Sequence, residues 1–201
     1  MAQCIEQRGF RIFPEYLDRS AQSELVDRVR ALLRQAPLFQ PVTPSGRPMS
    51  VRMSAAGQFG WVSDRGGYRY QEHHPNGTPW PAIPPEVLTI WAQLADSPRA
   101  PECCLINWYG DGARMGLHQD RDEADMSCPV LSISLGDEAL FRMGNETRGG
   151  KTESIWLRSG DVVVMGGAAR LRHHGIDRLR HGSSTLLPQG GRINLTLRVV
   201  S

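Results

Sequence analysis

The sequence predicts a mainly β protein with flanking helices, a sandwich or jelly roll, and three observations support this. From residue 103 onward, short segments with strand-like patterns alternate with Gly and Asp turns, and no helical periodicity intervenes. Within this part, residues 161–165 are almost entirely apolar, as expected of a strand buried on both faces. Helical patterns are confined to the first 100 residues, so the helices should flank the β core.

Two helices are predicted before the β core. Residues 20–35 form an amphipathic pattern with Ser20 as the N-cap and Pro37 just beyond the end. A second helix is predicted to begin at Pro84-Pro85-Glu86, because proline favours the first helical turn. Both have an apolar stripe, formed by Leu25, Val26, Val29, Leu32 and Leu33 in the first helix and by Val87, Ile90, Trp91 and Leu94 in the second.

The segment between the two helices, about residues 40–82, has a different composition. It is rich in Pro, Gly, Ser and aromatic residues, and it has little helical period. The alternation of Met49, Val51 and Met53 predicts a strand, and residues 61–70 predict a hairpin that turns at 64–67. We interpret residues 40–82 as a lid over the core, within a single domain that spans residues 1–201.

The core itself is assigned to about residues 103–201. Its predicted strands are short and are bounded by turn residues, as in an antiparallel sandwich. They lie at 103–109, 115–120, 129–135, 139–143, 154–157, 161–165, 170–174 and 192–199.

Composition narrows the class of protein. The 201 residues are 40% hydrophobic, enough for a sizeable core, and the formal net charge is only +2. No apolar run approaches the roughly 20 residues that span a bilayer, and residues 1–8 lack the apolar region of a signal peptide. The four cysteines show no disulfide or zinc spacing. We therefore expect a cytoplasmic protein without a membrane partner, compact enough to work as a monomer.

A metal site is indicated by the pair His118 and Asp120. Residues i and i+2 of a strand share a face, so both side chains can reach one ion. A third ligand would come from His173 or His174, which the pattern alone does not separate. Two imidazoles and one carboxylate with open positions favour iron(II) over structural zinc. The remaining histidines, in loop-like contexts, are interpreted as surface residues: His73, His74 and His181.

The last predicted strand carries a polar stripe at every second position. Its members are Arg192, Asn194, Thr196 and Arg198, and Asn107 and Tyr109 show the same spacing on an earlier strand. If the stripe faces into a barrel, its two guanidinium groups need an anionic partner, and a five-carbon keto-dicarboxylate would serve. The alternative is an amphipathic surface strand whose polar face meets water.

Arginine dominates the basic residues, and Lys151 is the only lysine. A cluster of basic residues surrounds His173 and His174, the two candidates for the third metal ligand. It forms either a solvated face or a rim that contacts phosphate, and the pattern leaves both interpretations open. It consists of Arg170, Arg172, His173, His174, Arg178, Arg180 and His181.

These features occur within a longer series of ordered motifs that covers nearly the whole chain. The series resembles the AlkB family, iron(II)- and 2-oxoglutarate-dependent dioxygenases that repair alkylated nucleobases. The motifs are Met49-Ser-Val, Gly60-Trp61, Pro79-Trp80-Pro81-Ala82, Leu105-Ile-Asn107-Trp-Tyr109, Leu117-His-Gln-Asp120, Ser132-Ile-Ser-Leu-Gly136, Gly160-Asp-Val-Val-Val164, His174-Gly175-Ile176 and Arg192-Ile-Asn-Leu-Thr-Leu-Arg198.

The resemblance implies a double-stranded β-helix (jelly roll) with a nucleotide-recognition lid, and it assigns three sets of site residues. Iron would be held by His118, Asp120 and His174. The co-substrate 2-oxoglutarate would be held by Asn107, Tyr109, Arg192, Asn194 and Arg198. The substrate would meet Trp61, Tyr68, Met49, Met53, Asp122 and Arg148. Departures from the well-known bacterial pattern are Met165, Ala169 and His173.

The implied activity is oxidative demethylation of N-alkylated bases of the 1-methyladenine and 3-methylcytosine type. It would use O2, decarboxylate 2-oxoglutarate and release formaldehyde, preferably on single-stranded DNA, with RNA as a further substrate. One alternative keeps the same cofactors and acts on a protein side chain or a small molecule. Another is a metal-dependent nucleic-acid-binding module without turnover.

Overall fold

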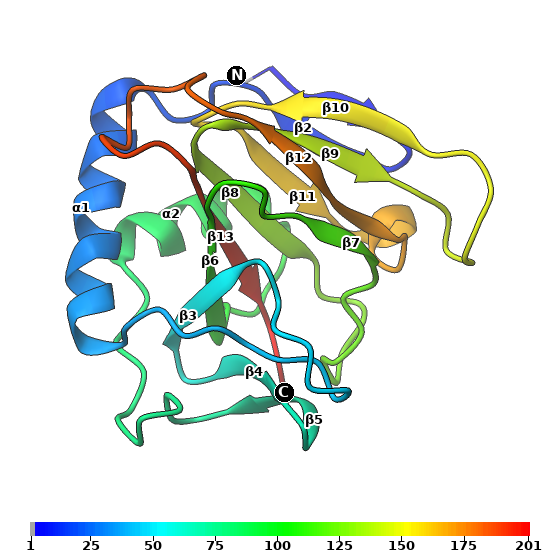
Figure 1. Ribbon diagram of the computed structural model, residues 1–201. Coiled ribbons are helices and arrows are strands. Elements are labelled where there is room, and N and C mark those ends of the chain that lie inside the picture. Colours follow the sequence, from blue (N-terminus) through cyan, green and yellow to red (C-terminus); the bar gives the residue numbers. More distant parts are fainter. Residues whose placement is uncertain (1–2) are drawn as a thin grey trace.

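The computed structural model describes residues 3–201 as two antiparallel sheets, a small hairpin and two long helices (Figure 1). In spatial order, the major sheet contains β1 (Ile5–Gln7), β2 (Phe10–Phe13), β11 (Val162–Met165), β8 (Val130–Gly136), β13 (Arg192–Arg198), β6 (Cys103–Tyr109) and β3 (Arg52–Gly57). The minor sheet contains β10 (Glu153–Leu157), β9 (Glu138–Met143), β12 (His174–Arg180) and β7 (Met115–His118). The mainly β prediction is confirmed.

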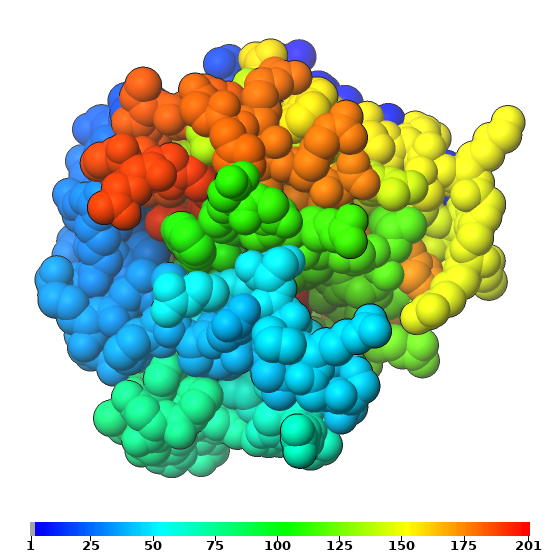
Figure 2. Space-filling model, in the orientation of Figure 1, coloured from blue at the N-terminus to red at the C-terminus, as the bar shows by residue number. Residues whose placement is uncertain are grey.

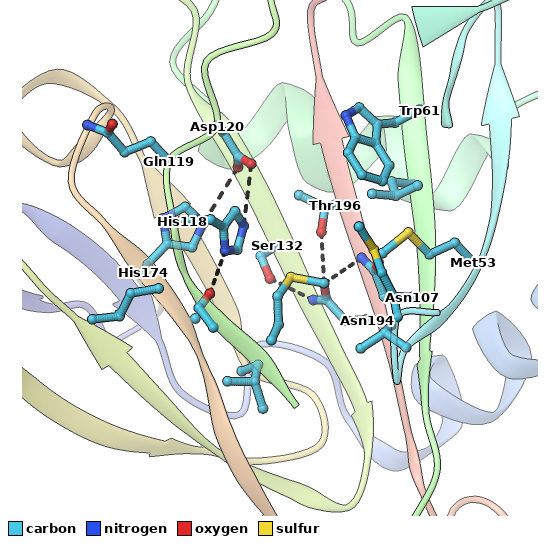
Figure 3. A pocket seen from close by; sticks show the side chains of 18 of the residues that line it. Met53, Trp61, Asn107, His118, Gln119, Asp120, Ser132, His174, Asn194 and Thr196 are labelled. Carbon is cyan, nitrogen blue, oxygen red and sulfur yellow. Dashed lines mark hydrogen bonds and ion pairs between the residues drawn. The ribbon is translucent and has the colours of Figure 1, made fainter. Parts of the chain in front are cut away.

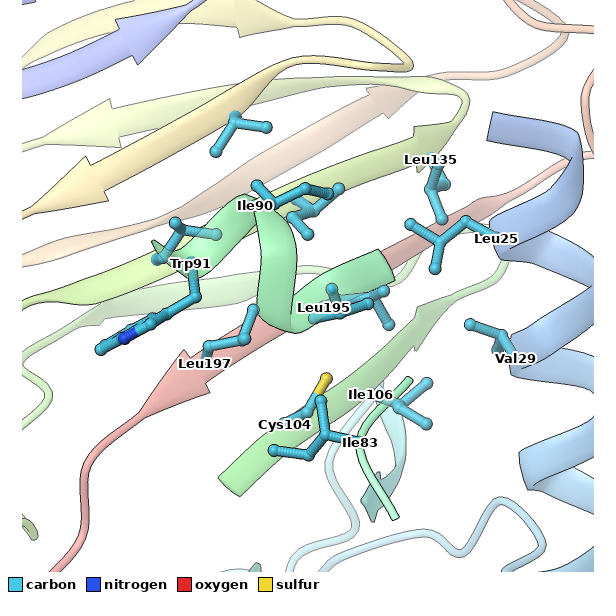
Figure 4. Close-up of a cluster of buried hydrophobic side chains, with 14 of the residues drawn as sticks. Leu25, Val29, Ile83, Ile90, Trp91, Cys104, Ile106, Leu135, Leu195 and Leu197 are labelled. Atoms are coloured by element: carbon cyan, nitrogen blue, oxygen red, sulfur yellow. The ribbon is translucent and has the colours of Figure 1, made fainter. Parts of the chain in front are cut away.

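Both helices pack on one face of the major sheet. They are α1 (Arg19–Gln35) and α2 (Pro85–Leu94), and their apolar stripes meet Leu195 and Leu197 of β13 (Figure 4). The other face of the major sheet meets the minor sheet through a second apolar cluster, which includes Phe10 and Phe141. Strand β13 therefore lies in the middle of the molecule, with its apolar face toward the helices and its polar face toward the minor sheet.

The helix boundaries correct one detail of the sequence analysis. The N-cap of α1 is Asp18, not Ser20, because Asp18 has extended backbone angles and its carboxylate accepts from the Ala21 amide at 2.9 Å. Ser20 lies within the first turn. The start of the second helix at Pro85 agrees with the prediction.

Replacing Asp18 with alanine is expected to lower the free energy of unfolding by about 1 kcal/mol, the usual cost of losing an N-cap. Ser20→Ala is the matched control and should change it by no more than a few tenths. Urea unfolding followed by circular dichroism measures both variants. Equal losses would contradict the assignment of the cap.

Several strand predictions need correction. Residues 170–174 do not form a strand; the 3-10 turn η1 (Gly167–Ala169) leads into a loop, and β12 begins only at His174. Strand β7 ends at His118, two residues earlier than predicted, and the strand near Met49 begins only at Arg52. The pair β1–β2 was not predicted, yet β2 pairs with β11 at the edge of the major sheet. The remaining core strands agree with the prediction within one or two residues.

The segment 40–82, which we call the lid, also supplies β3 to the major sheet, where β3 pairs with β6. The core is therefore not confined to residues 103–201, because β1, β2 and β3 belong to its major sheet. The lid also contains the hairpin of β4 (Gly60–Asp64) and β5 (Gly67–Gln71), which turns at 64–67 as predicted. His74 was interpreted as a surface residue, and this was wrong. Its ring is buried between Phe39 and Trp80, at centroid distances of 5.6 and 5.1 Å, and one ring nitrogen lies 2.9 Å from the Pro37 carbonyl oxygen. His73 and His181 are exposed, as expected. Within residues 3–201, no helix has the length and apolar content needed to cross a membrane.

Candidate active site

A cavity of about 620 Å³ lies between the two sheets and beneath the lid. Figure 3 shows it from close by, with His118, Asp120 and His174 on one side and Asn107, Asn194 and Thr196 on the other. On the face seen in Figure 2, the cyan lid lies against the green segment near residue 115. Two hydrogen bonds join them there, because the Ser50 hydroxyl bonds to both the backbone carbonyl and the backbone amide of Arg114.

Strand register explains how distant histidines meet. His118 of β7 and His174 of β12 are direct cross-strand partners, although 56 residues separate them. Asp120 follows the end of β7, and its carboxylate oxygens lie 3.7 Å from His118 Nε2 and 3.6 Å from His174 Nε2. One ligand atom from each of the three residues falls within 4.8 Å of the others. His173 does not join this cluster; its Nδ1 lies 2.9 Å from the Asn145 carbonyl oxygen.

The protonation of both rings suits a metal. Nδ1 of His118 lies 3.0 Å from the Gly116 carbonyl oxygen, and Nδ1 of His174 lies 3.1 Å from that of Arg172. A carbonyl only accepts, so each Nδ1 carries the proton and each Nε2 lone pair faces the shared space. Burial lowers the pKa of His174 to about 4, so this ring is neutral at physiological pH.

The carboxylate is ionised as well. Burial alone would raise the pKa of Asp120, but the positive charge of Arg198 and its hydrogen bond to the carboxylate oppose burial and hold the pKa well below its usual value. Asp120 Oδ1 accepts from Arg198 Nη2 at 2.9 Å, whereas the buried Oδ2 has no hydrogen-bond donor. An anionic oxygen without a donor, beside two imidazole lone pairs, fits a divalent cation with N, N and O ligands.

The polar stripe of β13 faces this cavity. Arg192 is 1% exposed, and Asn194, Thr196 and Arg198 are also buried. The alternative of a surface strand in water is therefore excluded. In the register of the sheet, Arg192 pairs with Tyr109 and Asn194 pairs with Asn107, so the two predicted co-substrate strands lie side by side.

Unpaired buried atoms of this wall fit a keto-dicarboxylate. Arg192 donates one hydrogen bond, to the Ser134 hydroxyl at 3.0 Å, and its guanidinium lies over the Tyr109 ring at 5.3 Å. Its Nε and Nη1 have no acceptor, and neither does Nη1 of Arg198. Burial lowers the pKa of Arg192, and the attraction of Tyr109 and Asp161 does not fully offset the cost of its buried charge. A carboxylate on Arg192 would remove that cost, which matches 2-oxoglutarate bound in the cavity.

The six residues assigned to the substrate all line the same cavity: Met49, Met53, Trp61, Tyr68, Asp122 and Arg148. The Trp61 and Tyr68 rings are stacked, with centroids 5.5 Å apart and planes at 16°. The Trp61 indole donates to the Asp122 carboxylate at 3.0 Å. Tyr68 is half exposed and Asp122 is exposed, so both can meet a ligand that enters from solvent.

Sequence reasoning missed two charged residues beside the site. Glu123 is buried, and Arg170, placed by the sequence analysis in a possible phosphate-contacting rim, instead points inward to pair with it at 3.0 Å. Arg178 and Arg180 are exposed but lie over the Trp156 ring, at 5.7 and 4.3 Å, and pair with acidic neighbours. The basic residues between Arg170 and His181 therefore form neither a single solvated face nor a continuous rim that contacts phosphate.

Several known proteins resemble this chain in sequence, and one solved structure resembles it in fold. Residues 9–198 match the sequence pattern of the family described as the 2OG-Fe(II) oxygenase superfamily. A protein of Caulobacter vibrioides named alpha-ketoglutarate-dependent dioxygenase AlkB homolog is 56% identical over 191 residues, which are 94% of this chain and 87% of that protein. The alpha-ketoglutarate-dependent dioxygenase AlkB of Escherichia coli is 39% identical, with 89% and 85% covered. The structure of OsALKBH1 superimposes with a TM-score of 0.80 at 28% identity and covers 97% of this chain and all of that one.

Proposed function

This chain belongs to the AlkB family of the 2OG-Fe(II) oxygenase superfamily, and from that premise we propose that it removes N-linked methyl groups from nucleobases of DNA. The observation that carries the proposal is the convergence of three residue groups on one cavity. The histidine–aspartate cluster, the Arg192 wall and the aromatic pair of the lid all line it. The enzyme is an iron(II)- and 2-oxoglutarate-dependent dioxygenase.

Iron and 2-oxoglutarate supply the oxidising power when bound: O2 is reduced, the keto acid is decarboxylated to succinate, and a C–H bond of the substrate is oxidised. The chain's own residues bind and orient. His118, Asp120 and His174 would hold the iron, while Arg192 would anchor the distal carboxylate of the co-substrate. The lid and the two sheets supply the walls of the cavity. Hydroxylation of an N-methyl group gives a hemiaminal, which breaks down to formaldehyde and the repaired base.

The aromatic pair of the lid and the nearby carboxylate of Asp122 together favour a cationic base that has left the duplex. An aromatic face binds any base, with roughly 1–3 kcal/mol per stack in single-strand complexes. A base methylated at N1 of adenine or N3 of cytosine cannot pair normally, so it leaves a duplex at low cost. Its positive charge would meet Asp122, whose carboxylate lies beside Trp61. We therefore propose these lesions as substrates, in single-stranded DNA first and RNA second.

We propose a monomer as the active unit, because one chain already brings the metal-ligand cluster, Arg192 and the aromatic pair of the lid together at one cavity. We also propose a cytoplasmic location, which the four free cysteines favour, because thiols stay reduced in that compartment.

The direct test is a panel of methylated oligonucleotides incubated with iron(II), 2-oxoglutarate and ascorbate. Mass spectrometry of the oligonucleotide and a formaldehyde assay should both report demethylation of 1-methyladenine and 3-methylcytosine. Single-stranded DNA, duplex DNA and RNA form three arms of the panel. Succinate formation without loss of methyl from any base would support a protein or small-molecule substrate instead.

A second candidate is demethylation of N6-methyladenine. A protein of Arabidopsis thaliana named DNA N(6)-methyladenine demethylase ALKBH1C is 30% identical over 221 residues, which cover 94% of this chain and 48% of that protein. N6-methyladenine is uncharged near neutral pH, so Asp122 offers it no charge attraction. The same panel separates the two candidates.

Asp122→Asn should discriminate between charged and neutral bases. Asparagine keeps the shape and the oxygen that accepts from Trp61, but it removes the negative charge. We expect kcat/KM for 1-methyladenine to fall about 10-fold, equivalent to ~1.4 kcal/mol, and kcat/KM for N6-methyladenine to change less than about twofold. Initial rates on matched oligonucleotides measure both. Equal losses on the two bases would show that the charge of Asp122 plays no part in selection.

A further inference from the structure

A second tyrosine of the lid connects it to the interior of the site. Tyr70 and Tyr68 lie two residues apart on β5, and both line the cavity. Whereas Tyr68 is half exposed, Tyr70 reaches inward and its hydroxyl lies 2.5 Å from Glu123 Oε1. Burial raises the pKa of Tyr70, so the phenol stays protonated and donates to the carboxylate. This contact joins the lid to a residue of the core.

Glu123 in turn contacts two buried arginines. Its side chain is 1% exposed; Oε2 accepts from Arg170 Nη2 at 3.0 Å, and Oε1 lies 3.2 Å from Arg198 Nε. The Arg198 contact is an ion pair without hydrogen-bond alignment, because Nε has no hydrogen-bond acceptor. One carboxylate oxygen therefore faces both the lid phenol and Arg198.

Both arginines then hold Asp120. Arg198 Nη2 donates to the Asp120 carboxylate at 2.9 Å, and Arg170 Nη1 donates to the Asp120 backbone carbonyl at 2.5 Å. Two guanidinium groups and two carboxylates thus balance their charges inside the protein. Because a buried network keeps its geometry only while each member stays paired, a change at Glu123 is transmitted to Arg198 and Asp120.

We propose that Tyr70 and Glu123 are positioning residues that couple docking of the lid to the binding of the co-substrate. The inference rests on the proposed function, because it takes 2-oxoglutarate as the ligand beside Arg198. When Tyr70 contacts Glu123, Arg198 is fixed with Nη1 unpaired and available to that ligand. Coupling between two sites is reciprocal, so 2-oxoglutarate must also favour the docked lid.

The test uses full-length Tyr70→Phe protein, loaded with iron(II) under anaerobic conditions and without nucleic acid. Phenylalanine keeps the ring and removes only the hydroxyl. We expect the Kd of 2-oxoglutarate, measured by calorimetry, to rise about 5- to 10-fold. We also expect 2-oxoglutarate to slow hydrogen exchange of the β4–β5 amides in the unchanged protein, and this protection to be largely lost in the variant. Tyr16→Phe, which removes a hydroxyl bonded to Gln93 far from the cavity, should behave as the unchanged protein.

Two results would overturn the coupling. Unchanged affinity for 2-oxoglutarate together with unchanged protection would show that the hydroxyl transmits nothing. Faster exchange of the lid to the same extent with and without 2-oxoglutarate, at unchanged Kd, would assign Tyr70 a purely structural role. Iron content measured on the same samples confirms that the variant is folded and loaded. No turnover of any base is needed, so failure of the demethylation assay and failure of this coupling are distinguishable.

Discussion

His174→Ala is expected to abolish stoichiometric iron(II) binding and to lower turnover by more than about 100-fold. This loss exceeds the roughly 10- to 100-fold loss that is usual when a residue bonded to a metal ligand is replaced. The reason is geometric, because Nε2 of His174 lies 3.6 Å from Asp120 Oδ2 and faces the shared space. Removing it leaves one imidazole and one carboxylate, too few to hold the ion on one face.

The neighbouring residue is the matched control for this variant. His173→Ala should retain iron, since His173 bonds to the Asn145 carbonyl and stands outside the cluster. Metal analysis after anaerobic loading and desalting measures both proteins. Loss of iron from His173→Ala, with iron retained by His174→Ala, would reverse the assignment of the third ligand.

Arg192→Met is expected to raise the Kd of 2-oxoglutarate about 100-fold, or ~3 kcal/mol, within the range for truncating a buried charge pair. Methionine fills much of the volume but offers no donor to the distal carboxylate. Iron binding should persist, because Arg192 touches none of the three proposed ligands. Calorimetric titration with 2-oxoglutarate measures the affinity, and Arg178→Met, an exposed arginine, is the control.

Thermal unfolding gives the same variant an independent signature. Saturating 2-oxoglutarate should raise the Tm of the unchanged protein but shift that of Arg192→Met little at the same concentration. Without 2-oxoglutarate, the variant should be no less stable than the unchanged protein, because it lacks a buried guanidinium without a carboxylate partner. A large loss of stability without ligand, combined with unchanged affinity, would show that Arg192 is structural.

The parts of the site that follow strand periodicity could be predicted from the sequence. The polar stripe that begins at Arg192 has period 2, and β13 places all of it in the cavity. What periodicity alone leaves open is which face is inward, and that is decided by the helices that cover the apolar face of the strand. Likewise, periodicity does not separate His173 from His174, because the choice depends on where β12 begins. The family resemblance assigned His174, and the pairing of His174 with His118 agrees with that assignment.

Residues in loops were missed for a different reason. Glu123 and Arg170 lie in irregular segments, and charged residues are normally exposed there, so no local signal indicates burial. Their burial depends on each other and on Arg198, which are long-range contacts. The absent strand at 170–174 has the same origin, because the Arg170 guanidinium binds the backbone carbonyls of Cys128 and Asp120 in the interior. The Asp18 cap was missed because Ser20 fits the same propensity two residues later.

The most direct test of the central claim is an anomalous difference map, recorded at the iron absorption edge, from crystals grown anaerobically with iron(II) and 2-oxoglutarate. We predict one strong peak within bonding distance of His118 Nε2, His174 Nε2 and an Asp120 carboxylate oxygen, with density for the keto acid running from the ion to Arg192. Iron bound elsewhere, or 2-oxoglutarate density that leaves the Arg192 guanidinium without a carboxylate, would contradict the account.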